Sequence, residues 1–145
     1  MKANNVKWLS FAILLATAAC AQAAPFEVSD AWFRALPGKL PAGGYFTADN
    51  RTGREIAITG ARADACGMLM IHQSSSKGGM SSMDMVDRVT VPPGGQVSFA
   101  PGGYHLMCTD PTPKMKIGTK VPVLFSLSDG STVAVAFQVR GASGK

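Results

Sequence analysis

The 145-residue sequence is poor in charge, and this excludes several classes of protein. Charged residues make up 16% of the chain and hydrophobic residues 46%, a balance too apolar for a disordered acidic or basic polymer. No run of Lys or Arg provides the footprint of a nucleic-acid-binding protein. The 16 Gly and 9 Pro follow no three-residue period, which excludes a collagen-like chain. The length suits one ordinary domain, which we expect to be a monomer.

Helical periodicity is also missing. No segment carries a convincing apolar stripe with a period of 3.6 residues, and short apolar segments separated by Gly and Pro follow one another instead. Val121–Leu127 and Val133–Val139 each alternate with period two on either side of Asp129-Gly130, which is typical of a β-hairpin. We therefore predict one all-β domain, a Greek-key β-sandwich or barrel of about eight strands. The other predicted strands are Phe26–Phe33, Tyr45–Ala48, Glu55–Ala61, Met68–His72, Val89–Val91, Gln96–Ala100 and Tyr104–Cys108.

The first 23 residues have the organisation of a secretory signal peptide. A Lys-containing start precedes the apolar run Trp8–Cys20 and the small-x-small site Ala21–Ala23. The run of 13 residues is too short to span a bilayer comfortably. We predict cleavage after Ala23, which leaves a periplasmic domain of residues 24–145 with no membrane span. Lipid attachment to Cys20 is a minor alternative, because the residues before it lack the Leu usual at such sites.

Histidine and methionine carry the chemical information. The sequence has two His and 8 Met, and they include the spaced set His72-x10-Met83-x21-His105-x-Met107. Residues two apart on a strand point to the same face about 7 Å apart, so His105 and Met107 can face one site. A β-fold can then bring His72 and Met83 beside that strand. No Ser/His/Asp arrangement or pair of carboxylates converges on this motif, which disfavours a hydrolase.

The donor set without a carboxylate indicates copper. Imidazoles and thioethers suit Cu(I), whereas carboxylates suit Mg, Ca or Mn. A structural zinc site needs several thiolates or more His. A blue-copper site needs a Cys thiolate, and strand alternation places Cys108 on the face opposite His105 and Met107. We therefore predict one Cu(I) bound as cargo by a protein that is not an enzyme.

The remaining methionines have two interpretations. Some fit ordinary core packing, for which Met is common: Met68, Met70 and Met115. The segment from Lys77 to Met85 is rich in Gly and Ser, and we expect it to form a polar loop whose methionines are available to a metal. The candidates for auxiliary ligands are Met80 and Met85 beside Met83, and more weakly Met70 on the His72 face.

The spaced motif resembles the signature of the periplasmic PCuAC copper chaperones, the copper chaperones for the CuA centre. The similarity covers essentially all of the predicted mature chain, including the stretches Asp30–Arg34, Ala42–Phe46 and Pro101–Met107. It implies a cupredoxin-like β-sandwich that delivers Cu(I) toward the CuA centre of cytochrome c oxidase subunit II, alongside Sco-type proteins. By position, the implied copper ligands are His72, Met83, His105 and Met107. The chain ends without the His- and Met-rich tail credited with a second site in some members, so we expect one copper per chain.

Two cysteines remain after removal of Cys20. Cys66 and Cys108 form an even pair in an oxidising compartment, and we predict a structural disulfide. Cys108 would be a thiolate ligand only if a bulge turned its side chain around. A thiol-disulfide redox protein would use the same pair, but the chain has no Cys-x-x-Cys motif and no βαβ pattern. A copper buffer for tolerance would use the same His/Met site as a chaperone, and this alternative stays open.

Overall fold

The computed structural model describes residues 23–145, which contain ten β-strands and no helix. The predicted signal peptide and Cys20 lie outside the described residues, apart from Ala23. Among the residues described, no helix is long and apolar enough to cross a membrane. The strands are β1 (Phe26–Arg34), β2 (Ala42–Asn50), β3 (Ile56–Arg62), β4 (Cys66–Lys77), β5 (Met80–Met85), β6 (Val89–Val91), β7 (Gln96–Phe99), β8 (Tyr104–Pro111), β9 (Lys120–Leu127) and β10 (Thr132–Arg140).

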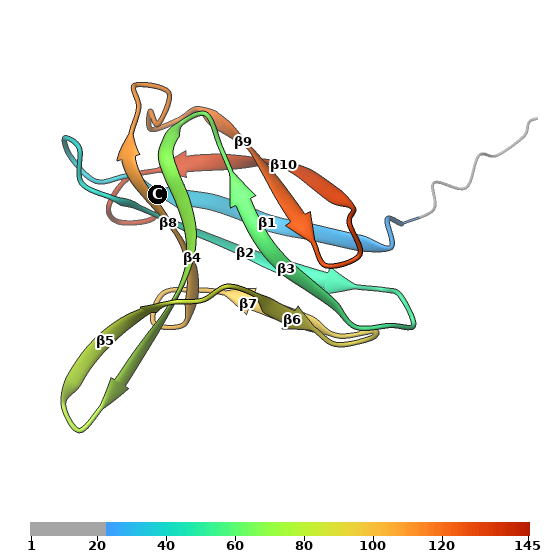
Figure 1. Cartoon of the computed structure of the whole chain (residues 1–145). Coiled ribbons are helices and arrows are strands. Elements are labelled where there is room, and N and C mark those ends of the chain that lie inside the picture. The colour runs from blue at the N-terminus through green and yellow to red at the C-terminus, as the bar shows by residue number, and fades with distance from the viewer. Residues whose placement is uncertain (1–22) are drawn as a thin grey trace, which may run out of the picture.

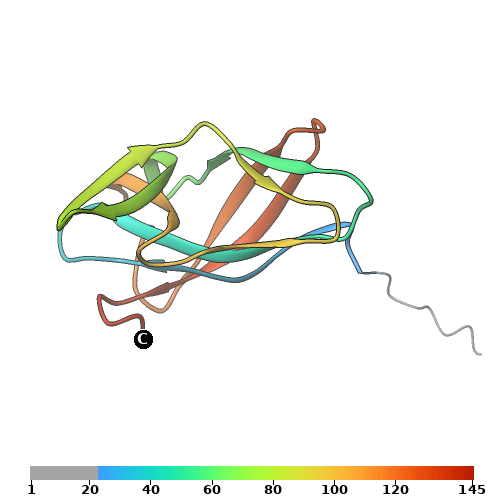
Figure 2. The same cartoon turned by 90° about the horizontal axis from the view of Figure 1, so that it is seen from below.

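All ten strands belong to one sheet, in the order β5-β4-β8-β2-β1-β10-β9-β3-β6, with β7 paired to β2 (Figure 1). The pairings are antiparallel except for β1 with β10, which is parallel. The sheet folds over into two layers, which Figure 2 shows from below, and this brings β3 close to β4. The prediction of a single all-β domain is confirmed.

The core lies between the two layers and follows the predicted period of two. In β9 the buried positions alternate with exposed ones, and Val121, Val123 and Phe125 are each at most 2% exposed. The ring of Phe125 lies 4.9 Å from that of Phe46, and Phe46 stacks on Phe99 at 4.1 Å between centroids. In strands with one buried side, the alternation of apolar residues in the sequence therefore predicts correctly which side faces the core.

The strand count is ten and not about eight, and the main difference is the hairpin of β4 and β5. The segment expected to be a polar loop is strand β5, which pairs with the second half of β4. Gly78 and Gly79 have φ of 59° and 79°, the positive values that a tight two-residue hairpin turn requires. Ser75 and Ser82 also share a hydrogen bond of 2.8 Å across the hairpin. Figure 1 shows this hairpin projecting away from the body of the sheet.

Candidate metal centre

His72 and His105 are direct partners across two neighbouring strands. His72 lies on β4 and His105 on β8, and they face each other in the antiparallel register. Directly paired residues point to the same face of a sheet, and the two ring centroids are 5.8 Å apart. The two imidazoles of the chain therefore belong to one site, although 32 residues separate them in the sequence.

The ring nitrogens are arranged to leave lone pairs for a metal. The Nδ1 of His105 lies 3.1 Å from the carbonyl oxygen of Gly103. As the donor in this hydrogen bond, Nδ1 carries the proton and leaves a lone pair on Nε2, an arrangement typical of metal-binding histidines. The Nδ1 of His72 is buried and has no hydrogen-bond partner among the described residues. A buried nitrogen without a partner is costly unless it binds something, so the pair fits a metal.

Burial favours the neutral form of the His72 imidazole. Burial, and to a smaller extent repulsion from the neighbouring His105, lower the pKa of His72 below its ordinary value. A neutral imidazole is the form that ligates a metal, so near neutral pH the His72 ring is already in the state that binding requires.

Methionines occupy neighbouring register positions on the same face as the histidine pair. Met70 and Met107 are direct partners across β4 and β8, one step along from the His pair and on the same face. On the other side, Met85 of β5 pairs directly with His72, and Met83 pairs with Ser74, one step further out. Met83 is 52% exposed and Met85 is 66% exposed. The His pair is therefore flanked by thioethers on both sides.

Met80 and Met68 occupy different places from those expected. Met80 pairs with Lys77 near the turn of the hairpin, on the face opposite the His pair. It is the auxiliary candidate that the register does not bring to the site. Met68, which the sequence pattern assigned to core packing, is 58% exposed and follows Met70 on the His72 face. The alternation of Met68, Met70 and His72 was the signal that could have placed it there.

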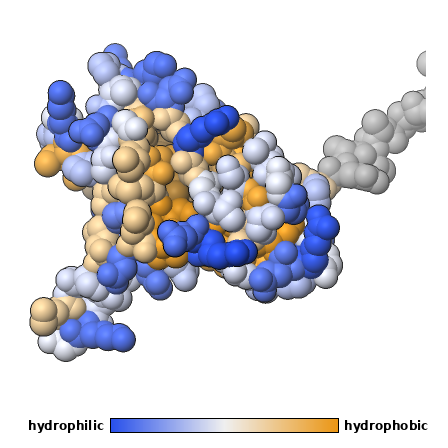
Figure 3. All heavy atoms as spheres, viewed as in Figure 1, coloured by the Kyte–Doolittle hydropathy of each residue, from blue (hydrophilic) through white to orange (hydrophobic). Residues whose placement is uncertain are grey.

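No acidic residue joins this donor set. Among residues 23–145, no three or more His, Cys, Asp or Glu side chains cluster in a way that could hold a metal ion. Figure 3 shows apolar side chains gathered on the face around β4, and both apolar and hydrophilic ones on the projecting hairpin. Two imidazoles among thioethers form a soft site that suits Cu(I) better than Mg, Ca or Mn.

The two cysteines within residues 23–145 form a disulfide, and Cys108 faces away from the His pair. Cys66 and Cys108 are bonded, with 5.3 Å between their Cα atoms, and the bond joins β4 to β8. Cys108 pairs with Leu69 in the register and is 0% exposed, so it lies on the inner face, opposite Met107. The bond matches the expected pairing, and within residues 23–145 it leaves no cysteine thiolate for the metal.

Comparison with known proteins identifies the family. Residues 26–139 match the family described as "LpqE-like: Putative lipoprotein LpqE-like". The chain belongs to the LpqE-like family. A relative named "Putative lipoprotein Lxx21020", from Leifsonia xyli subsp. xyli (strain CTCB07), is 34% identical over 125 residues, which are 85% of this chain and 74% of the relative.

Solved structures place this LpqE-like protein among PCuAC folds. The copper-bound PCuAC domain from PmoF2 superposes with a TM-score of 0.68 at 20% identity, covering 81% of this chain and 94% of that domain. The Cu(I) form of DR1885 from Deinococcus radiodurans superposes with a TM-score of 0.64 at 27% identity, covering 83% of this chain and 81% of that one. The predicted cupredoxin-like fold of the PCuAC domains is therefore confirmed.

Proposed function

We propose that this LpqE-like protein is an extracytoplasmic metallochaperone that carries one Cu(I) per chain. The observation that carries the proposal is the pairing of His72 with His105, flanked by thioethers and without a carboxylate. The copper-bound PCuAC structures with the same fold support it. The proposed ligands are His72, Met83, His105 and Met107.

The proposed ligand Met83 lies on the hairpin of β4 and β5, which projects from the body of the sheet. Met83 lies on the same face as His72, one residue pair further along the hairpin. Met85 and Met70 lie nearer to the imidazoles in the register, and they are the auxiliary donors that the geometry supports. Met83 and Met85 are both more than half exposed, so donors of a partner protein can approach the copper before the chain's own ligands leave.

The proposed recipient is the CuA centre of cytochrome c oxidase subunit II, with Sco-type proteins as partners. Copper is the cargo of this protein and not a resident cofactor. A strain lacking the protein tests the role: loss of oxidase activity that added copper restores supports delivery. Sensitivity to copper with normal oxidase activity would instead show a copper buffer.

Export follows from the predicted signal peptide of residues 1–23. The family and the Leifsonia relative carry the word lipoprotein in their names, which favours lipid attachment at Cys20 as a second candidate for the N-terminus. Mass spectrometry of the protein isolated from its own cells separates the two. A chain that starts at Ala24 supports cleavage after Ala23, and an acylated chain that starts at Cys20 supports the membrane anchor.

The ligand set is tested by Cu(I) titration against a competing chelator. The Met83→Leu/Met107→Leu variant keeps the side-chain volume and removes both sulfurs, so the fold should be little affected. Changes around metal sites commonly weaken affinity by about tenfold or more, and loss of two ligands should cost at least that. Met115→Leu, which removes a sulfur that packs against the core, is the matched control and should bind as the wild type does. Wild-type affinity in the double variant would contradict the assignment.

X-ray absorption decides between the auxiliary donors. The spectrum of the Cu(I)-loaded protein reports how many sulfur and nitrogen atoms surround the metal. A sulfur count that falls in Met85→Leu or Met70→Leu would make that residue a ligand. Met80→Leu should leave the spectrum unchanged, because the register places Met80 on the opposite face.

A further inference from the structure

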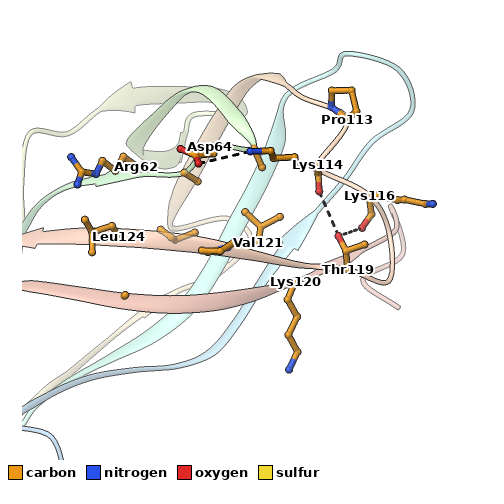
Figure 4. Close-up of a pocket in the computed structure, with 14 residues that line it drawn as sticks. Arg62, Asp64, Pro113, Lys114, Lys116, Thr119, Lys120, Val121 and Leu124 are labelled. Carbon is orange, nitrogen blue, oxygen red and sulfur yellow. Dashed lines mark hydrogen bonds and ion pairs between the residues drawn. The ribbon is translucent and has the colours of Figure 1, made fainter.

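A cleft lies beyond the disulfide, at the end of the molecule away from the His pair. Strand β3 ends at Arg62, which pairs with Leu124 of β9, so the preceding residues of β9 have no strand beside them on that side. The turn Ala63–Ala65 and the loop after β8 enclose the space that remains, which has a volume of about 510 Å³ (Figure 4). Volumes of this size are ordinary for binding sites.

The cleft has an apolar floor. Ala65, Val121 and Val123 contribute to it, and each is at most 2% exposed. Leu124 and its direct partner on β10, the exposed Ala134, extend the apolar lining across the sheet. An occupant that buries aliphatic side chains is therefore favoured over a purely polar one.

The rim carries positive charge at both ends. Figure 4 shows Arg62 toward one end of the cleft and Lys116 at the other, with the Lys120 side chain near Lys116 but directed to the side of β9 opposite Val121. None of these three pairs with a carboxylate within residues 23–145, whereas Lys114 lies 3.8 Å from Asp64. Arg62 pairs with Leu124, which lies four residues from Lys120 along β9. The Arg62 end of the cleft is therefore about 13 Å from the Lys120 end.

The backbone of β9 limits how an occupant can bind. Thr119 accepts a hydrogen bond of 2.9 Å from Val139 at the end of β10. Strand alternation then turns the backbone groups of Lys120 and Pro122 toward the cleft. Pro122 has no N–H to donate, so a strand added beside β9 could not form a continuous ladder of backbone hydrogen bonds. Side-chain contacts must therefore provide much of the recognition.

We propose that this cleft binds an extended segment of a partner protein that has aliphatic residues at its centre and carboxylates at both ends. A fatty acid would match the apolar floor but would leave the cations of one end without a partner. His72 lies six residues beyond Cys66 on β4, about 20 Å along the strand, so a segment bound in the cleft leaves the His/Met face open. The proposal does not depend on copper binding.

The test uses the oxidised, copper-free mature chain and three fluorescein-labelled peptides. These are EDLVLDE, its charge-reversed form KKLVLKK, and EDSGSDE, which lacks the aliphatic centre. Fluorescence anisotropy should show binding of the first peptide alone, with an affinity that falls as salt is raised. Arg62→Gln/Lys120→Gln should weaken that binding at least fivefold, and so should Ala134→Glu, which places a negative charge in the apolar lining.

A matched control removes the same charge elsewhere. Lys77→Gln/Arg88→Gln changes two exposed cations away from the cleft and should stay within twofold of the wild type. Circular dichroism checks that each variant is folded. Equal binding of the three peptides, or wild-type affinity in Arg62→Gln/Lys120→Gln, would overturn the proposal. So would binding of octanoate in the cleft, followed by NMR, by a protein that does not bind EDLVLDE.

Discussion

The disulfide between Cys66 and Cys108 should stabilise the fold strongly without taking part in copper binding. The bond closes a loop with a sequence separation of 42. In the chain-entropy model such a loop removes about 13 cal/mol/K from the unfolded ensemble, or about 4 kcal/mol at 25 °C. This is an upper value, because native strain and residual structure in the unfolded chain reduce it. A loss of about 2–4 kcal/mol on breaking the bond is therefore expected, a large part of the stability of a small domain.

Urea unfolding of the copper-free protein measures this contribution. The same chain, oxidised or reduced with a phosphine, isolates the bond from any change in side-chain volume. Cys66→Ala/Cys108→Ala provides a form that cannot reoxidise and that can be titrated with Cu(I) without a reductant that competes for the metal. Because Cys108 is buried on the inner face, opposite Met107, the Cu(I) affinity of this variant should stay within about threefold of the wild type.

Two results would refute this reasoning. A stability difference below about 1 kcal/mol between the oxidised and reduced chains would show that loop closure does not limit the unfolded state. A Cu(I) affinity lowered tenfold or more in a folded double-alanine variant would show that a cysteine sulfur acts at the metal site. The second result would also contradict the placement of Cys108 on the inner face.

Because the pKa of His72 is lowered in the folded protein, the unfolded chain takes up a proton first as pH falls below the ordinary value of 6.5, and the free energy of unfolding should decrease. Urea unfolding midpoints should therefore be lower at pH 5 than at pH 7.5. His72→Gln should make this difference smaller. Gly44→Ala should cost about 1–3 kcal/mol in thermal or urea unfolding, because its Cβ would lie 2.8 Å from the ring of Phe33, whereas Gly60→Ala meets no atom within 4 Å and is the control. Gly79→Ala places a residue with a Cβ at a φ of 79°, which should destabilise the hairpin by about 1–2 kcal/mol. Amide hydrogen exchange in β5 should therefore become faster, while the amides of the core stay protected.

The sequence by itself determined the fold class and the identity of the chemical groups. Where a strand buries one face, the alternation of apolar and polar residues can be read from the local sequence. In β9 each apolar position of this pattern that faces the core is buried. The Asp129-Gly130 turn between β9 and β10 was equally visible, because Gly130 supplies a positive φ that few other residues adopt. The spacing of His72 and His105 with their methionines indicated a soft donor set.

Tertiary structure decided which of these groups meet. That His72 lies opposite His105 is a matter of register between strands distant in the chain, and register follows from the packing of the whole sheet. The β4–β5 hairpin was missed because both of its faces are largely solvated, so no apolar alternation marks it. Its register places Met85 opposite His72 and turns Met80 to the other face. The cleft beside β9 exists because β3 ends at Arg62, and the length of one strand relative to its neighbour is a property of the assembled sheet alone.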